Sequence, residues 1–199
     1  MRWLCTGAAV ALVACSTAGF SDDFGDCGHP LQAPLRARAE LSIDARPAGI
    51  EIVGSDTETV RVSCTVGDSE RAQDVKLRFS GGDESGKLTV TAPFEHGSLQ
   101  VRVEVPRKTN LRIHTPAGQV TVEHVVGNKD IDLYAGQITI SSTEAWNYRS
   151  IDASVIIGDV RAAAYGIDKG GFFRSFTREI PDGDYRIRAH LITGQIDLQ

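Results

Sequence analysis

Residues 117–122 read Ala117-Gly118-Gln119-Val120-Thr121-Val122, and this stretch decides the fold because its pattern returns three more times. The copies are Ala135-Gly136-Gln137-Ile138-Thr139-Ile140, Ile157-Gly158-Asp159-Val160-Arg161-Ala162 and Thr193-Gly194-Gln195-Ile196-Asp197-Leu198. The four glycines are 18, 22 and 36 residues apart, so the last gap is twice the first. A fixed period of about 20 residues is typical of a solenoid, in which each copy forms one coil.

Apolar residues alternate with polar ones on both sides of each glycine, which indicates two β-strands per copy. In the first copy Leu111, Ile113 and Ala117 lie at odd offsets before Gly118, and the valines that follow lie at even offsets. Because the parity changes at the glycine, we expect two strands to meet there at a corner with the same face inward. Glycine suits a corner because it adopts positive φ without steric cost.

The residue after each glycine is polar, namely Gln119, Gln137, Asp159 or Gln195. Stacked coils would place these residues in a row, where each amide can bond the one above and below and fix the register. The alternative is a row of ligand-binding amides along one edge. We expect the structural ladder.

Length and composition indicate one all-β domain. The chain has 199 residues, 20 of them glycine, and no long amphipathic helical period. Shorter alternating runs over 35–106 predict a less regular sheet or sandwich portion, in which Ile50 and Ile52 follow Gly49 much as in the later copies. The expected fold is thus a short β-solenoid of stacked two-stranded coils with a less regular N-terminal β half. The net charge of −5, with both signs interleaved, argues against a nucleic-acid partner.

The N-terminus reads as an export signal. Residues 1–14 hold one basic residue and an apolar run too short to span a bilayer. The run ends in Leu12-Val13-Ala14-Cys15, which resembles the lipobox of bacterial lipoproteins, in which the cysteine is acylated and becomes the mature N-terminus. Cleavage after Ala18 is the alternative. We expect a lipid anchor at Cys15, an outer-membrane location, a tether over 15–34 and a folded domain over 35–199.

Export leaves two cysteines, Cys27 and Cys64, in an oxidising compartment. A disulfide between them would hold the N-terminal tail on the first strands, and two buried free thiols are the alternative. Neither cysteine has a CxxC or paired-histidine context, so we expect no metal site.

The interval between Ala164 and Asp184 interrupts the repeat and is rich in aromatic residues. Phe172, Phe173, Arg174 and Phe176 form either a binding platform or part of a cap that covers the solenoid. We expect the cap and keep the platform as the candidate binding surface.

The sequence contains no recognisable catalytic arrangement. The five histidines are scattered, and the chain has no G-x-S-x-G elbow and no phosphate-binding glycine loop. Acidic residues do not recur at one offset of the repeat, as the groove of a β-helix carbohydrate-active enzyme would require. We therefore expect a non-enzyme without a cofactor.

The glycine phrases, the Gly170-Gly171-Phe172-Phe173-Arg174-Ser175-Phe176 insert and the closing strand at 185–190 together resemble the bacterial "putative adhesin" family. The resemblance covers roughly residues 35–199. It implies a β-solenoid domain on an exported or lipid-anchored chain and supplies no catalytic residues. The expected function is an adhesin-like binding or scaffolding module whose partner is an envelope or extracellular protein or glycan. A periplasmic regulatory or sensory subunit is the alternative, and open solenoid ends permit a homo-oligomer.

Overall fold

The computed structural model describes residues 21–46, 48–67, 69–92, 99–141 and 145–199. These residues form β-strands joined by turns and three short 3₁₀ segments, with no α-helix among them, so the expected all-β class is confirmed. The strands are β1 (Ser21–Gly25), β2 (Leu31–Pro34), β3 (Glu40–Ala45), β4 (Ala48–Ser55), β5 (Thr59–Thr65), β6 (Lys76–Gly81), β7 (Ser85–Thr91), β8 (Gln100–Pro106), β9 (Asn110–Glu123), β10 (Lys129–Ser141), β11 (Tyr148–Ala162), β12 (Ile167–Glu179) and β13 (Tyr185–Leu198). The 3₁₀ segments are η1 (Ser69–Asp74), η2 (Ala145–Asn147) and η3 (Ala163–Tyr165).

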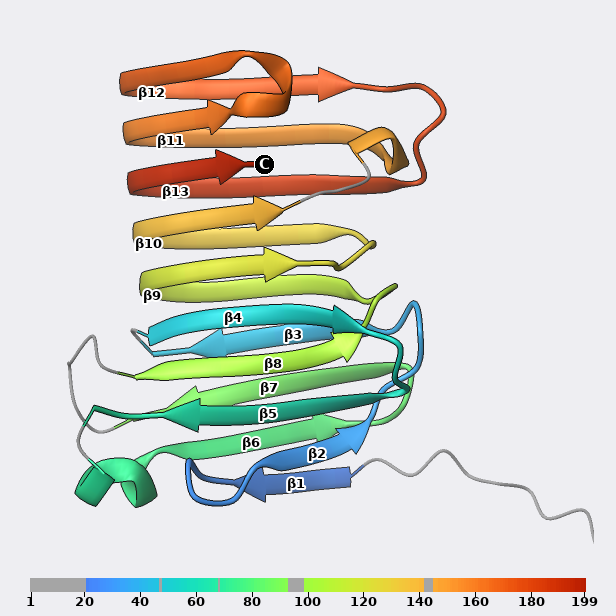
Figure 1. Cartoon of the computed structure of the whole chain (residues 1–199), viewed down its shortest axis with the longest axis vertical. Helices are drawn as coiled ribbons and strands as arrows, with labels where there is room; N and C mark the ends of the chain where they lie inside the picture. Colours follow the sequence, from blue (N-terminus) through green and yellow to red (C-terminus); the bar gives the residue numbers. More distant parts are fainter. Residues whose placement is uncertain (1–20, 47, 68, 93–98, 142–144) are drawn as a thin grey trace, which may run out of the picture.

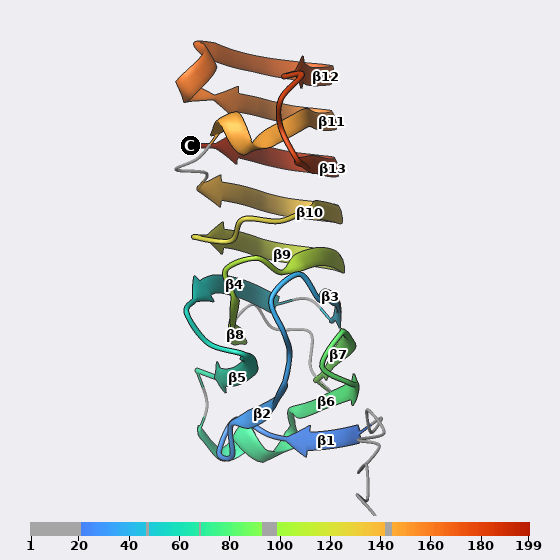
Figure 2. The same cartoon turned by 90° about the vertical axis from the view of Figure 1, so that its right-hand side faces the viewer.

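All these strands belong to one open sheet. Its main path of neighbours runs β1-β6-β7-β3-β9-β10-β13-β11-β12, and the shorter strands β2, β5, β8 and β4 pair beside it. Figure 1 shows an elongated stack with β1 near one end and β12 at the other, and Figure 2 shows the same order from the side. The two ends of the molecule therefore present different elements to their surroundings.

The repeat glycines align where the long strands bend. In the parallel pairings of β9, β10, β13 and β11, each repeat glycine stands opposite the repeat glycine of its neighbour. Figure 1 shows each of these strands turning back on itself at one side of the stack. Gly136 has a φ of 135°, and a Cβ built on it would lie 1.8 Å from the carbonyl oxygen of Gly118. Glycine is needed there both for its backbone conformation and for close approach of the next strand.

The order of the copies in space differs from their order in the chain. The corners stack as Gly118, Gly136, Gly194 and Gly158, because β13 lies between β10 and β11. The doubled interval before Gly194 explains this order. It contains β12, which pairs antiparallel with β11 at the end of the sheet, before the chain returns as β13 on the other side of β11.

The N-terminal half repeats the two-armed arrangement in separate strands. β3 pairs in parallel with the first arm of β9 and β4 with the second, while β7 and β8 pair in parallel with β3 and β4. The register sets Ala48, and not Gly49, opposite Gly118. The expected correspondence between Gly49 and the repeat glycines is therefore wrong by one residue.

The buried apolar side chains form one continuous cluster. The alternation predicted from the repeats appears as alternating buried and accessible residues along the strands, with Val120, Val122, Ile138 and Ile140 almost fully buried. Dense packing of such side chains is the main source of stability in a sheet of this kind.

Part of the expected tether belongs to the sheet. The tether is expected over 15–34, but from residue 21 onward β1 pairs with β6 and β2 pairs with β5. Leu31, Ala33 and Leu35 alternate and are buried, but this run is too short to stand out among the surrounding Pro and Asp residues. The structure also joins Cys27 to Cys64 in a disulfide with a Cα–Cα distance of 4.8 Å, which ties the β1–β2 turn to β5.

Candidate functional site

The glycine corners and the aromatic insert lie on the same edge of the molecule. The register continues from the repeat strands into β12, so that Gly158 of β11 stands opposite Gly171, and Ile157 opposite Phe172. The sequence identified the glycine row and the insert as separate features. The structure brings them together because β12 bends at the same level as its neighbours.

The polar row beside the glycines does not form the predicted ladder. Gln137 and Gln195 both donate their side-chain N–H groups to Asp197 Oδ2, at 3.1 and 2.5 Å. Asp159 instead pairs with Arg161 at 3.8 Å. Within the described ranges, no side-chain hydrogen bond joins two of the four predicted ladder residues, and Gln119 is exposed. The physical reason is that a carboxylate is a stronger acceptor than an amide oxygen, so Asp197 takes both donors.

An apolar strip runs along this corner edge, and we call it the distal ridge. It consists of Tyr134 of β10, Ile192 of β13, Ile157 of β11, and Phe172 and Phe173 of β12. Tyr134 and Ile192 lie between the same two register pairs, Leu133–Leu191 and Ala135–Thr193. Tyr134 is 64% exposed, Phe172 67% and Phe173 80%. The five residues come from four neighbouring strands, with Ile157 opposite Phe172 of β12 on one side and Thr193 of β13 on the other.

Three of the four insert residues predicted as a binding surface are exposed, and the fourth, Phe176, is buried. Phe172 and Phe173 project outward, whereas Phe176 is buried and stacks on Tyr165 with ring centroids 5.3 Å apart. Arg174 Nε donates to the carbonyl oxygen of Gly170 at 2.8 Å, which joins the two arms of β12.

These contacts close the end of the core. Lys169 Nζ donates to the carbonyl oxygen of Ser175 at 3.2 Å, again across the bend of β12, and the Arg178 guanidinium lies 4.4 Å from the centre of the Tyr165 ring. Long cationic side chains can cover apolar surface with their stems while their charged ends remain in water. β12 therefore covers the end of the core, as expected for a cap. The exposed rings of Phe172 and Phe173 belong to this same strand.

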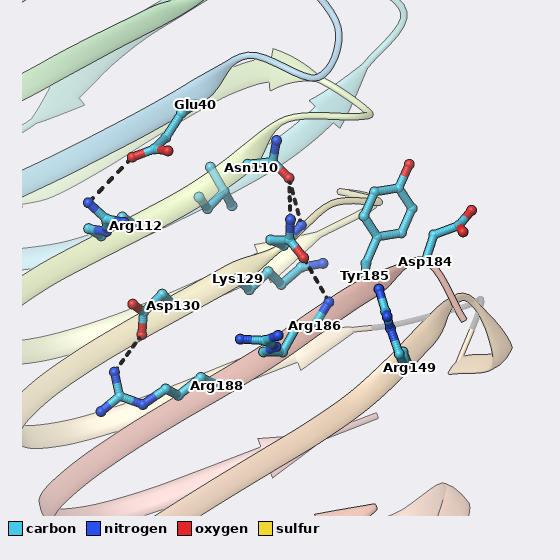
Figure 3. A pocket seen from close by; sticks show the side chains of 12 residues that line it. Glu40, Asn110, Arg112, Lys129, Asp130, Arg149, Asp184, Tyr185, Arg186 and Arg188 are labelled. Atoms are coloured by element: carbon cyan, nitrogen blue, oxygen red, sulfur yellow. Dashed lines mark hydrogen bonds and ion pairs between the residues drawn. The ribbon is translucent and has the colours of Figure 1, made fainter. Parts of the chain in front are cut away.

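A second candidate is a polar groove at the opposite ends of the repeat strands, where β9, β10 and β13 begin (Figure 3). It encloses about 530 Å³. Its charged lining residues are Arg112, Arg149, Arg186, Arg188, Glu40, Asp130 and Asp184, together with Lys129.

The charges in this groove are paired only in part. Arg112 pairs with Glu40 at 3.4 Å and Arg188 with Asp130 at 3.2 Å, so two of the four guanidinium groups have carboxylate partners. Arg149 and Arg186 have no carboxylate within 4.0 Å among the described residues, but Asp184 lines the same groove. Cross-strand pairs of opposite sign help to hold strands in register. The paired residues of the groove therefore help to fix the strand register, and its lining holds one more guanidinium group than carboxylate groups.

Two asparagines that line the groove form the ladder that the glutamines do not. Asn110 Oδ1 accepts hydrogen bonds from the backbone and side-chain N–H groups of Asn128, both at 3.0 Å, and Asn128 Oδ1 accepts from the backbone N–H of Arg186 at 2.9 Å. Sequence reasoning missed this feature, although both asparagines begin copies of the repeat and lie 18 residues apart.

Lys129 is a buried lysine at the wall of the groove. It is 2% exposed and stands at an inward position of β10. Its Nζ donates to the carbonyl oxygens of Val125 and Gly127, at 2.8 and 3.3 Å, and to the Tyr148 hydroxyl. Burial lowers the pKa of Lys129 to about 7, because desolvation disfavours the charged form.

Over the described ranges, no group of three or more His, Cys, Asp or Glu side chains is arranged to hold a metal ion. The same residues include no helix long and apolar enough to cross a membrane. Cys15, the signal segment and the cleavage alternative after Ala18 lie outside the residues that the structure describes.

Comparison with solved structures finds a similar fold. The chain is similar to a protein from Clostridium sporogenes described as a putative cell adhesion protein, with a TM-score of 0.55 and 10% sequence identity. The match covers 90% of this chain and 99% of the other. No protein-family model matches the chain, and no curated protein matches its sequence. At this identity the likeness concerns the fold alone.

Proposed function

We propose that this chain is an exported, non-enzymatic, adhesin-like binding module, held at the outer membrane by a lipid on Cys15. The observation that carries the proposal is the position of the distal ridge, which lies at the end of the sheet opposite β1. The described chain begins with β1, close to the proposed anchor. The structural neighbour described as a putative cell adhesion protein agrees with this role.

The proposed anchor and the ridge are separated by the length of the stack. The main path from β1 to β12 contains nine strands and therefore eight spacings. At about 4.8 Å per spacing these span roughly 40 Å. A chain anchored next to β1 would thus hold the ridge away from the membrane, as an adhesin requires.

The finer architecture that we propose is a short solenoid. The in-register corners of β9, β10, β13 and β11 support it, and β3 with β4 and β7 with β8 would be degenerate coils. Coils stacked in this way form a rigid spacer as well as a scaffold for the exposed edge. The strands at the two ends of the stack have free edges through which the chain could form homo-oligomers.

The proposal is tested by mass spectrometry of the mature N-terminus combined with protease shaving of intact cells that express the full chain. We expect an acylated Cys15 and loss of the domain upon shaving. A mature start at Gly19 without lipid would overturn the anchor.

The ridge also suits a periplasmic regulatory or sensory subunit that docks onto an envelope complex. Both functions use the same apolar surface, so the side of the membrane separates them. Full protection from protease, together with an acylated Cys15, would favour the periplasmic function over the adhesin.

A further inference from the structure

We propose that the distal ridge is a docking site for a protein surface that is apolar and bordered by carboxylates. This inference rests on the proposed binding function and names the partner that the site fits. Large apolar side chains that remain exposed in a contiguous patch commonly mark interaction sites. Tyr134, Ile157, Phe172 and Phe173 are four of the six large hydrophobic residues exposed in the described part of the chain, and they share one edge.

The composition of the ridge favours a protein over a sugar chain. Ile157 and Ile192 lie between the ring of Tyr134 and those of the two phenylalanines. Aliphatic side chains are stabilised by apolar partner surface and offer no hydrogen bond to hydroxyl groups, which lose their water on contact. Aromatic anchors placed among aliphatic residues are the usual centre of a protein interface.

The charges next to the ridge indicate an acidic border on the partner. Lys169 and Arg174 flank Phe172 and Phe173 along β12. Their polar contacts are to backbone carbonyl oxygens, and neither has a carboxylate within 4.0 Å among the described residues. Two positive charges therefore remain to attract carboxylates of a partner.

The same charges disfavour a second copy of this chain as the partner. A two-fold contact through Phe172 and Phe173 would bring Lys169 and Arg174 of both copies toward one another. Like charges placed together across an interface oppose association. The ridge thus fits a different protein better than itself.

The test is selection of a displayed library of random 16-residue peptides on the full mature chain. We expect the enriched peptides to combine aromatic or aliphatic residues with Asp or Glu. Binding should fall at least tenfold with Phe172→Ser and Phe173→Ser combined, and severalfold with Lys169→Gln or in high salt. Phe24→Ser is the matched control, because Phe24 is 72% exposed but lies in β1 at the other end, and it should leave binding unchanged.

Several results would overturn the inference. One is a peptide consensus without acidic residues, and another is peptide binding that survives the combined Phe172→Ser and Phe173→Ser change. A third is binding to glycans on a parallel array when no peptide is enriched. Thermal melts of each variant show that the fold is retained. If the peptide selection fails but Cys15 is acylated and the domain is removed by protease shaving, the proposed adhesin-like function still stands. If the selection succeeds but the domain on intact cells is protected from protease, the same docking site would serve a partner in the periplasm.

Discussion

The corner glycines carry the tightest steric requirement of the fold at the residue scale. A Cβ on Gly136 would meet the Gly118 carbonyl oxygen, whereas Gly166 has positive φ with nothing within 4 Å of the position where a Cβ would lie. We predict that Gly136→Ala destabilises the domain by more than about 2 kcal/mol and Gly166→Ala by about 1 kcal/mol, which is the backbone cost alone. Chemical denaturation measures both. Equal losses would show that the corner imposes no close contact.

Lys129 makes stability depend on pH in a defined direction. Its pKa is about 7 when folded, compared with 10.5 for an ordinary lysine, so between these values the unfolded chain binds the extra proton. Stability should therefore rise with pH from about 7 to 10, by up to about 1.4 kcal/mol per pH unit, and the penalty should be complete below pH 7.

Lys129→Met removes this titrating group, so denaturation curves of the variant should lose that slope. Lys87→Met, which removes a surface lysine, is the control. A wild-type slope that persists in Lys129→Met would assign the pH dependence to another group.

The sequence predicted the corners well and the residue contacts less well. Glycine recurrence and the parity change follow directly from backbone geometry, so Gly118, Gly136, Gly158 and Gly194 could be placed in advance. The predicted glutamine ladder does not form because Gln137 donates to Asp197 and not to another glutamine. Asp197 becomes available as an acceptor only because β13 lies beside β10. The parity of the repeat places Tyr134 on the outward face, but its position on the same edge as Phe172 and Phe173 could not be inferred, since it depends on the order of the strands.

At the scale of elements, the disulfide secures the most weakly paired end of the sheet. β1 and β2 are short, and Cys27 in the turn between them is bonded to Cys64 of β5, 37 residues away. We predict that Cys27→Ala combined with Cys64→Ala lowers stability by roughly 3–4 kcal/mol. Calorimetry should give the same shift when the wild type is reduced, and no further shift when the variant is treated with reductant. An unchanged melting temperature would contradict a stabilising role.

β12 carries both a buried ring, Phe176, and the exposed rings of the proposed docking site. We predict that Phe176→Ala costs roughly 3 kcal/mol, because its ring packs on Tyr165 and closes the core. Phe173→Ala should change stability by less than about 0.5 kcal/mol, since the ring is largely in solvent. Thermal or chemical unfolding of the two variants compares residues of the same type on one strand. A large loss at Phe173 would mean that the ridge belongs to the core.

The sequence could not predict the order of elements in space. Each repeat strand has nearly the same pairing edges, so nothing local in the chain states that β13 lies between β10 and β11. The strands at 21–34 were missed for a related reason, because four or five residues give too short a pattern to separate from a linker.

At the scale of the whole molecule, the proposed function depends on the proposed anchor and the distal ridge lying at opposite ends of the stack. β1 follows the proposed anchor, and β12 presents the ridge at the far end of the stack (Figure 1). With the proposed lipid anchor, the sheet between them would hold the proposed docking site away from the membrane.

The most direct test is to label Phe173→Cys on intact cells with a membrane-impermeant maleimide. Val160→Cys, at a fully buried position, is the unreactive control. The account predicts that the cysteine introduced at position 173 is labelled on intact cells, because Phe173 is 80% exposed at the end away from the anchor. Labelling that requires permeabilisation of the outer membrane would contradict surface display by this domain.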